Sequence, residues 1–353
     1  MFMGHGIQDE SGFLKFSPRF TDKEARIIAN EFYGMKASAK PLPSERDQNF
    51  LLEDNGSGER YVLKISNKKE KKEILELQNL AMDRVGTTLG PHFCPQVCPT
   101  KDGENITRID NRERDSHFVR MVTYIHGVPL GEVTTHTPGL LRSVGKLIAC
   151  ISESLKGFSH PAAQRDFYWD LQKGPETVLR FQKYIDDGDK RSLVGYFIER
   201  FNVQALSIVA EMERSVVHND GNDYNILVNH PGPRQNDLFQ GRIAGIIDFG
   251  DMVYSYTVGD IAVALAYIML DKKNLAGAVS PVLKGYNEVS PLSERELVAV
   301  NHLTNLRLCM SVALSAFQKK QNPNNNYLTI SEKKAWKLLQ RLRDSNYNIV
   351  NSL

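Results

Sequence analysis

The residues best suited to chemistry lie in the stretch VVHNDGNDYNILVN, which covers residues 216–229. Two apolar residues lead into a polar cluster, and a short apolar run follows it. The cluster contains His218, Asp220 and, five residues after Asp220, Asn225, in the pattern H-x-D-x4-N. A carboxylate can accept or orient the proton of an attacking hydroxyl group, and Asp and Asn supply the oxygen ligands that Mg²⁺ prefers. The alternative explanation is a turn rich in Asp and Asn between two strands.

A second motif, IIDFGD, follows at residues 246–251, so that Asp248 lies 28 residues after Asp220. Upstream, Lys64 lies in the strand-like stretch YVLKI, and Glu76 lies in the helix-like stretch that follows it. A lysine on a strand, an acid on a helix, H-x-D-x4-N and then D-F-G is the order of the parts that transfer a phosphoryl group in kinases. Each part is common by itself, but their shared order predicts a kinase-type site.

Phosphoryl transfer gives each of these residues a predicted role. The transferred group passes through a loose transition state whose charge is spread over its oxygen atoms, so catalysis is mostly positioning and charge neutralisation. Asp220 is the predicted catalytic base, and Asn225 and Asp248 are the predicted ligands of Mg²⁺. Lys64 is expected to contact the α- and β-phosphates of the nucleotide, and Glu76 is expected to hold Lys64 in place.

The nucleotide base is expected to lie against the apolar strand FVRMVTYI, residues 118–125. The backbone there, at Val122 and Tyr124, would recognise the edge of the base. Leu227 and Ile247 are expected to pack against its faces. Recognition by backbone groups does not distinguish ATP from GTP in a sequence.

The elements around the lysine predict a small α+β lobe. Thr21 and Glu24 form a capping box at the start of a helix, which Gly34 ends. The turn sequence DNGSG lies between two strand-like stretches and indicates a hairpin. In order, the predicted elements are a helix over 21–32, strands over 49–53 and 60–65, a helix over 69–84 and a hairpin over 104–125.

From residue 137 the sequence becomes mostly helical, with short strands that carry the two motifs. The predicted helices cover 138–157, 190–213, 258–271, 293–318 and 331–345, and the predicted strands cover 215–217, 226–229 and 242–248. The fold class is therefore α+β, a protein-kinase-like two-lobed fold with a small α+β N-lobe and a mostly helical C-lobe. We expect a flexible N-terminal tail over 1–20, a nucleotide-binding lobe over 21–125 and a catalytic and substrate-binding lobe over 126–353.

Composition excludes several classes of partner. Among the 353 residues, 44 Lys and Arg nearly balance 42 Asp and Glu, so no overall basic field favours nucleic acid. No run of 18 apolar residues predicts a membrane span, and the N-terminus lacks the pattern of a secretory signal. Four cysteines without a framework of disulfide spacings fit a reducing compartment, so we expect a cytoplasmic protein.

Two sequence features of protein kinases are missing here, which argues against a protein kinase. No G-x-G-x-x-G loop precedes the lysine, and no A-P-E motif or long activation segment follows D-F-G, so a peptide substrate is not expected. Over about residues 21–345 the chain resembles the aminoglycoside phosphotransferase-like kinases, which act on small molecules and use H-x-D-x4-N with I-D-F/W-G. In that family the phosphate loop is short and polar, and the resemblance implies that Gln48 and Asn49 take this place.

Within the family, the stretches LPSERDQNFLL, YVLKISN, HNDGNDYNILV and GIIDFGDMVYSY resemble most the members that act on hydroxylysine. The resemblance implies phosphorylation of 5-hydroxy-L-lysine with GTP as donor and Mg²⁺ as cofactor. A kinase for another amino alcohol, of the choline, homoserine or aminoglycoside type, is an alternative. So is an inactive module that only binds nucleotide, although the predicted base, lysine and metal ligands are all present.

Such an acceptor carries one carboxylate and two ammonium groups, which need charged partners. Asp251, three residues after Asp248, is expected to contact an ammonium group or to be a second acid of the metal site. Arg307 lies in the apolar helical stretch NLRLCM and needs a buried partner, either the substrate carboxylate or an internal acid. Trp169 is expected to line the pocket or to belong to the core.

Overall fold

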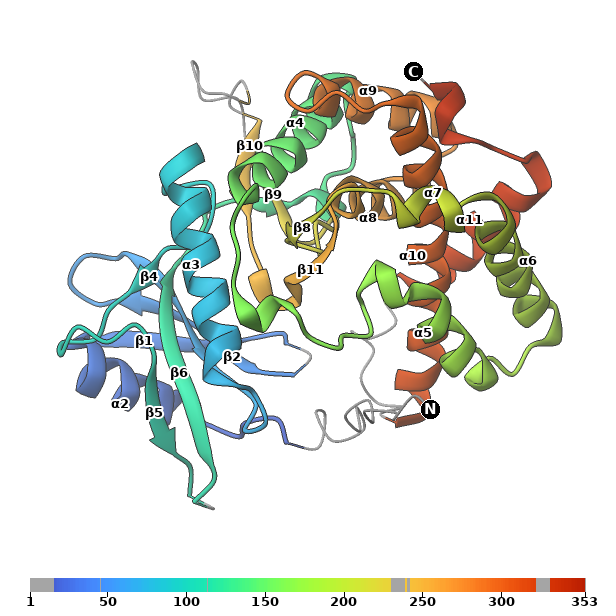
Figure 1. The fold of residues 1–353 in the computed structure, drawn as a ribbon. Coiled ribbons are helices and arrows are strands. Elements are labelled where there is room, and N and C mark those ends of the chain that lie inside the picture. Colours follow the sequence, from blue (N-terminus) through green and yellow to red (C-terminus); the bar gives the residue numbers. More distant parts are fainter. Residues whose placement is uncertain are drawn as a thin grey trace. The chain divides into compact units, whose positions relative to one another are not determined.

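The computed structural model of this chain describes residues 16–44, 46–112, 114–229, 239, 242–321 and 331–352. These residues form two compact units. The first unit runs to Gly86 and continues over Pro95–Tyr124, and the second contains Thr87–Cys94 and the chain from Ile125 onward. Figure 1 labels most of the helices and strands of both units.

The described part of the first unit is a six-stranded antiparallel sheet with helices α2 and α3. The strand order is β1-β2-β3-β6-β4, and β5 pairs with β6 beside that path. The elements are α2 (Asp22–Tyr33), β1 (Ala37–Leu42), β2 (Gln48–Asp54), β3 (Arg60–Ile65), α3 (Lys72–Leu89), β4 (Val97–Cys98), β5 (Thr107–Asp110) and β6 (Ser116–Thr123). Both predicted hairpins and both predicted helices of this unit are confirmed.

Local sequence signals determine where these elements begin and end. At the start of α2, the Thr21 hydroxyl accepts a hydrogen bond from the Glu24 amide, and the Glu24 carboxylate accepts one from the Thr21 amide. Gly34 ends the helix in the left-handed conformation, with φ of 68°. In the turn between β2 and β3, Asp54 Oδ1 accepts a hydrogen bond from the Gly56 amide. The predicted capping box and turn are therefore both present.

The packed part of the first unit begins before residue 21, which corrects the predicted length of the tail. Phe20 is buried in the same apolar core as Phe50 of β2. Its amide donates to Gln48 Oε1 and its carbonyl oxygen accepts from Gln48 Nε2, both at 2.7 Å. Strand β1 was also not predicted, because its sequence ASAKPL has a weak apolar pattern and a proline.

The described part of the second unit is mostly helical, as predicted. Its helices are α4 (Pro138–Leu155), α5 (Gly174–Phe181), α6 (Gly188–Gln204), α7 (Leu206–Ala210), α8 (Gly259–Ile268), α9 (Leu275–Asn287), α10 (Glu294–Gln321) and α11 (Glu332–Ser345). The helix predicted over 190–213 is instead two helices, α6 and α7, which meet at Ala205. Helices α5 and α9 were missed: α5 is short, and α9 contains Pro281, a residue that normally argues against a helix interior.

Two small sheets place the motif loops side by side. Strand β9 (Ile226–Val228) pairs with β10 (Ile243–Ile246) and β7 (Val128–Pro129), and β8 (Arg214–Val217) pairs with β11 (Val253–Tyr256). Ile226 is opposite Ile246, and Val217 is opposite Val253. The H-x-D-x4-N loop runs from β8 to β9, and the D-F-G loop runs from β10 to β11. Because β8 pairs with β11 and β9 pairs with β10, the two loops lie next to each other. Strand β11 was not predicted.

Helix α10 runs through the core of the second unit (Figure 1). Among the described helices it is the one long and apolar enough to cross a membrane, but most of its apolar stretch is buried inside the protein. A core helix satisfies the same criteria, so packing within the unit accounts for its composition.

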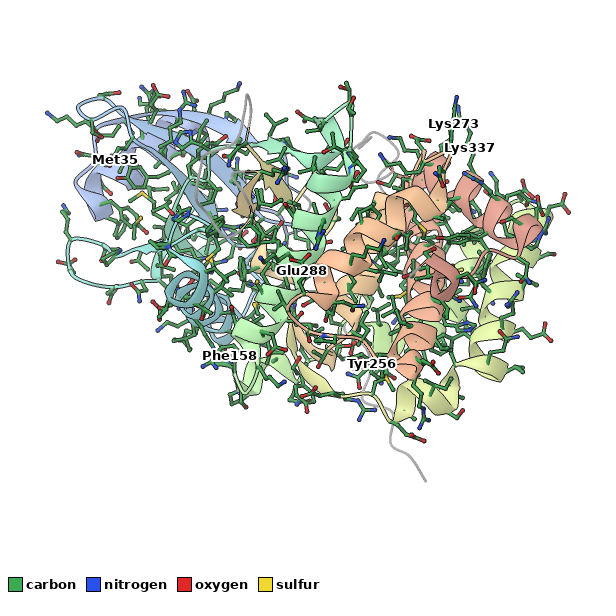
Figure 2. All side chains as sticks on the ribbon, turned by 90° about the horizontal axis from the view of Figure 1, so that it is seen from above. Met35, Phe158, Tyr256, Lys273, Glu288 and Lys337 are labelled. Atoms are coloured by element: carbon green, nitrogen blue, oxygen red, sulfur yellow. The ribbon has the colours of Figure 1, made fainter. Side chains whose placement is uncertain are left out.

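Two glycines allow helices α4 and α9 to pack closely. A Cβ atom at Gly145 of α4 would lie 1.9 Å from the carbonyl oxygen of Val282, and one at Gly285 of α9 would lie 1.9 Å from that of Arg142. Glu288, labelled in Figure 2, follows α9 and forms an ion pair with Arg142. The helix pair can adopt this spacing only where side chains are absent.

Gly145→Ala is therefore expected to destabilise the protein by about 3 kcal/mol, the upper end of the usual cost of overpacking. The matched control is Gly195→Ala in α6, where a new Cβ atom has nothing within 4 Å. That control should stabilise by about 0.5–1 kcal/mol, because alanine is the better helix former. Denaturant unfolding of the three proteins measures both effects. Equal stability of the Gly145→Ala protein and the wild type would show that the helices are not so closely packed.

Candidate functional site

A buried acid holds the start of the H-x-D-x4-N loop. Asp260, in the first turn of α8, is 2% exposed. Its Oδ1 accepts a hydrogen bond from the Asn219 amide at 2.7 Å, and its Oδ2 accepts one from the His218 amide at 3.2 Å. Because these two amides precede Asp220 in the chain, Asp260 determines where the loop leaves β8.

Asn219 ties the same loop to its neighbours. Its backbone is in the left-handed conformation, with φ of 64°. Its side-chain amide donates to the carbonyl oxygens of Trp169 and Asp251, each at 3.2 Å. The loop, the D-F-G segment and the stretch that carries Trp169 are therefore joined at one residue.

Three side chains donate hydrogen bonds to the carboxylate of Asp220. Asn222 Nδ2 lies 2.9 Å from Oδ1, and Asn225 Nδ2 lies 2.6 Å from Oδ2. Arg307 Nη2 lies 3.2 Å from Oδ1. The side chain of Asp220 is only 17% exposed, so these donors replace most of the water that a carboxylate requires. Oδ2, with one donor, has room to accept a further hydrogen bond from a hydroxyl group.

The surroundings change the acidity of both titratable residues in the motif. Burial, followed by the charge of Asp251, raises the pKa of Asp220, and the guanidinium of Arg307 acts in the opposite direction. Burial lowers the pKa of His218 to about 4, so its ring is neutral at pH 7. The His218 ring packs edge-on against Phe249, 4.7 Å between centroids, and its Nδ1 accepts a hydrogen bond from the Asp220 amide. The histidine is a neutral brace of the loop.

Asn225 and Asp248 lie at the ends of adjacent strands. The Ile247 amide donates to the Asn225 carbonyl oxygen at 2.9 Å, which brings the next residue, Asp248, beside Asn225. Both hydrogen bonds of Asn225 Nδ2 go to Asp220, so the side-chain oxygen of Asn225 remains for a ligand. Asp248 is exposed. Across the described ranges no group of three or more His, Cys, Asp or Glu could hold a metal ion, but Mg²⁺ needs only one or two protein oxygens beside phosphates and water. The pair fits that ion.

Of the two partners predicted for Arg307, the structure shows an internal acid. Arg307 is 1% exposed and its ion pair is with Asp220. Its Nη1 also donates to the Trp169 carbonyl oxygen at 3.3 Å. Trp169 is half-buried beneath the guanidinium, with 4.2 Å between the guanidinium carbon and the ring centroid. Asp251 lies in the short 3-10 helix Phe249–Asp251 and is also half-buried.

The predicted phosphate-binding lysine lies in the first unit. Lys64 is on β3, opposite Arg120 of β6. Glu76 of α3 forms an ion pair with Lys72 in the same helix, at 3.4 Å, and its pairing with Lys64 stays a prediction. Arg120 ties α3 to the sheet, since its guanidinium donates to Asn79 Oδ1 at 2.6 Å.

Gln48 and Asn49 belong to strand β2, where they pair with Ile65 and Lys64, and not to a loop. The side chain of Gln48 is occupied by the backbone of Phe20. Oδ1 of Asn49 is buried, with no hydrogen-bond partner among the described residues. Phosphate binding by these two residues stays a prediction.

The residues predicted for the nucleotide base are divided between the units. Val122 lies on β6 and is 3% exposed, and Tyr124 ends the first unit. In the second unit, Leu227 and Ile247 pack in one apolar cluster with Ile125. The structure thus brings Leu227 and Ile247 together, and the base site as a whole stays a prediction.

Arg165 is a positioning side chain of the second unit that sequence reasoning missed. Arg165 Nη2 donates to the Gly250 carbonyl oxygen at 2.8 Å, and its guanidinium lies 4.1 Å from the Phe167 ring centroid. This contact fixes the glycine of D-F-G from a segment more than 80 residues upstream. An arginine in a polar stretch carries no signal for such a contact, so only the fold could reveal it.

Comparisons with known proteins identify the family of the chain. The model of the phosphotransferase enzyme family matches residues 38–294. Hydroxylysine kinase of Mus musculus is 30% identical over 370 residues, which cover 100% of this chain and 96% of that protein. Hydroxylysine kinase of Danio rerio is 30% identical over 340 residues, which cover 92% of each.

Two solved structures share the fold. A microcompartment-associated aminopropanol kinase superposes with a TM-score of 0.71 at 17% identity, covering 92% of this chain and 98% of that one. The amicoumacin kinase hAmiN, in complex with AMP-PNP, Ca²⁺ and Ami, superposes with a TM-score of 0.67 at 14% identity, covering 94% and 95%. The predicted fold class, α+β and protein-kinase-like with two lobes, is confirmed.

The anchoring of the loop by Asp260 leads to a testable expectation. Asp260→Asn replaces one acceptor oxygen by an NH₂ group that faces a backbone amide, so the loop must move. We expect kcat to fall by about 10²-fold, the usual effect of a misplacement on the order of 1 Å. The control is Asp166→Asn, an exposed acid, which should keep wild-type turnover. Wild-type kcat in the Asp260→Asn protein would show that the two amide contacts do not position the base.

Proposed function

The chain belongs to the phosphotransferase enzyme family, and on that premise we propose that it transfers the γ-phosphoryl group of GTP to the hydroxyl group of 5-hydroxy-L-lysine. It is a kinase of the kind that phosphorylates alcohol groups. The observation that carries the proposal is the Asp220 carboxylate, which is buried, held by three donors and still able to accept at Oδ2. A carboxylate in this setting can accept the proton of a substrate hydroxyl group.

Each residue of the candidate site has a proposed role in phosphoryl transfer. Asp220 accepts or orients the proton of the acceptor hydroxyl, which makes its oxygen a better nucleophile. Asn225 and Asp248 would hold Mg²⁺, which neutralises charge on the phosphate groups when bound. Lys64 is proposed to contact the α- and β-phosphates. Gln48, Asn49, Val122, Tyr124, Leu227 and Ile247 remain the proposed nucleotide contacts, with Glu76 as the proposed support of Lys64.

The proposed acceptor suits the acids of the site. Hydroxylysine carries two ammonium groups, and Asp251 is a half-buried acid on the segment that Asn219 ties to the base loop. A carboxylate so placed can pair with an ammonium group beside the reacting hydroxyl. The exposed edge of Trp169 is proposed to line the same pocket. The curated relatives named as hydroxylysine kinases support this choice of acceptor and match the chain over nearly its full length.

A substrate panel tests the proposal. Purified protein, Mg²⁺ and either GTP or ATP are incubated with hydroxylysine, choline, homoserine or kanamycin, and release of nucleoside diphosphate is followed. Hydroxylysine with GTP should give the highest kcat/KM. Lysine is the matched control, since it binds through the same charges but lacks the hydroxyl. Turnover of choline or kanamycin without turnover of hydroxylysine would overturn the acceptor and leave the kinase. No turnover at all would favour a module that only binds nucleotide.

The role of the base is tested by Asp220→Asn, which keeps the shape of the side chain and removes the proton acceptor. We expect kcat to fall by about 10²–10⁴-fold, the usual contribution of general acid–base catalysis. Nucleotide affinity, measured by isothermal titration, should stay at the wild-type value and serves as the control for folding. Retention of most of the turnover would contradict the assignment of the loop.

The metal site is tested by Asp248→Ala. Removal of this carboxylate should lower kcat by about 10²–10³-fold or more, as expected when a group that neutralises transition-state charge is lost. Titration with a non-hydrolysable GTP analogue, with and without Mg²⁺, should show that affinity no longer depends on the metal. Metal-dependent binding equal to that of the wild type would count against Asp248 as a ligand.

A further inference from the structure

Arg307 is the largest fully buried side chain in the described part of the chain. It lies in the middle of α10, where the flanking residues, Leu306 and Leu308, are both apolar and buried. Taking a guanidinium out of water is expensive unless it is paired. Helix packing alone would be served better by another leucine or methionine, so the position calls for an explanation.

The contacts of Arg307 join the base loop to two neighbouring segments of the second unit. Nη2 is 3.2 Å from Asp220 Oδ1, and Nη1 is 3.3 Å from the carbonyl oxygen of Trp169. The guanidinium carbon lies 4.2 Å from the Trp169 ring centroid and 5.8 Å from that of Tyr267. The same Trp169 carbonyl oxygen also accepts the side-chain amide of Asn219. A planar group with donors at two corners matches these two acceptors, whereas an ammonium group would reach only one.

The two carboxylate oxygen atoms of Asp220 accept different numbers of hydrogen bonds. Oδ1 accepts from both Arg307 and Asn222, which fills its two lone pairs. Among the described residues, the one donor to Oδ2 is Asn225, the predicted metal ligand. Arg307 thus fixes the rotation of the carboxylate so that Oδ2 is the oxygen left for the acceptor hydroxyl.

A substrate carboxylate would find no place on Arg307 in this structure. Its side chain is 2% exposed, and its Nε is buried without a hydrogen-bond partner in the described ranges. A second carboxylate would have to displace Asp220 or the Trp169 carbonyl oxygen from the guanidinium.

We propose that Arg307 is a positioning residue for the catalytic base, which orients Asp220 and balances its charge, and that it is not the ligand of the substrate carboxylate. The inference rests on the proposed kinase function of the loop. The negative charges of Asp251 and Asp248 raise the pKa of Asp220, and the positive charge of Arg307 lowers it.

Two substitutions test this role, Arg307→Met and Arg307→Lys. In Arg307→Met we expect kcat to fall by about 10²-fold, with less than about a threefold change in the KM of the acceptor. Arg307→Lys keeps the charge but only one donor direction, and should recover about tenfold of that loss. The control is Arg295→Met on the same helix, whose exposed ion pair with Glu211 should not affect turnover.

A change in the substrate separates the two possible roles of the arginine. In 1,5-diaminopentan-2-ol the carboxylate of hydroxylysine is absent and the hydroxyl and both amines are kept. A positioning residue predicts the same fold-loss in kcat/KM for both acceptors in each variant. A carboxylate ligand predicts that the loss disappears with the diamine and that the acceptor KM rises at least about tenfold with hydroxylysine.

A double variant tests whether Arg307 acts through Asp220. In the Asp220→Asn background, Arg307→Met should cost less than about a further twofold in kcat, because both changes remove one function. An equal loss in both backgrounds would overturn the inference. If Arg307→Met does not fold, Arg307→Lys decides: unchanged kcat overturns the proposal, and lowered kcat with constant KM supports it. The proposed function is tested separately, by measuring which acceptor of the substrate panel the wild-type protein phosphorylates. The variants are then assayed with that acceptor.

Discussion

The candidate site of the second unit depends on keeping one buried carboxylate, that of Asp220, hydrogen-bonded beside two other acids. A carboxylate with little access to water is stable only when side-chain donors replace the solvent. Here the donors come from within the loop, at Asn222 and Asn225, and from a helix nearly 90 residues away, at Arg307. The polar residues that crowd the H-x-D-x4-N stretch are therefore mutual partners.

Two helices of the second unit meet this requirement. Helix α8 supplies Asp260, which holds the two amides before the base, and α10 supplies Arg307 to its carboxylate. The strand pairs β8–β11 and β9–β10 fix the ends of the two motif loops. Burying Asp260 on α8 and Arg307 on α10 within apolar packing costs free energy. Both side chains contact the same eight-residue loop. The helices thus act as a rigid support that positions a few atoms.

Much of this could be predicted from sequence because the signals were local. The capping box at Thr21, each of the kinase-type motifs and the long apolar helices depend on residues close together in the sequence. Contacts between distant segments could not be predicted in the same way. The partner of Arg307 remained open between substrate and protein, because an arginine on an apolar helix requires an acid without specifying which one. The packing of Phe20 was missed for the same reason, since its hydrogen bonds come from Gln48 in a strand 28 residues later.

The most direct test of the central claim follows the phosphoryl group itself. Protein, Mg²⁺, GTP and hydroxylysine are incubated, and ³¹P nuclear magnetic resonance with proton correlation identifies the product. The buried, oriented base predicts a phosphomonoester on the oxygen of carbon 5, formed in equal amount with GDP and formed about 10²–10⁴-fold more slowly in the Asp220→Asn reaction. Inorganic phosphate as the only new phosphorus species besides GDP, or a phosphoester formed at an undiminished rate without the Asp220 carboxylate, would contradict it.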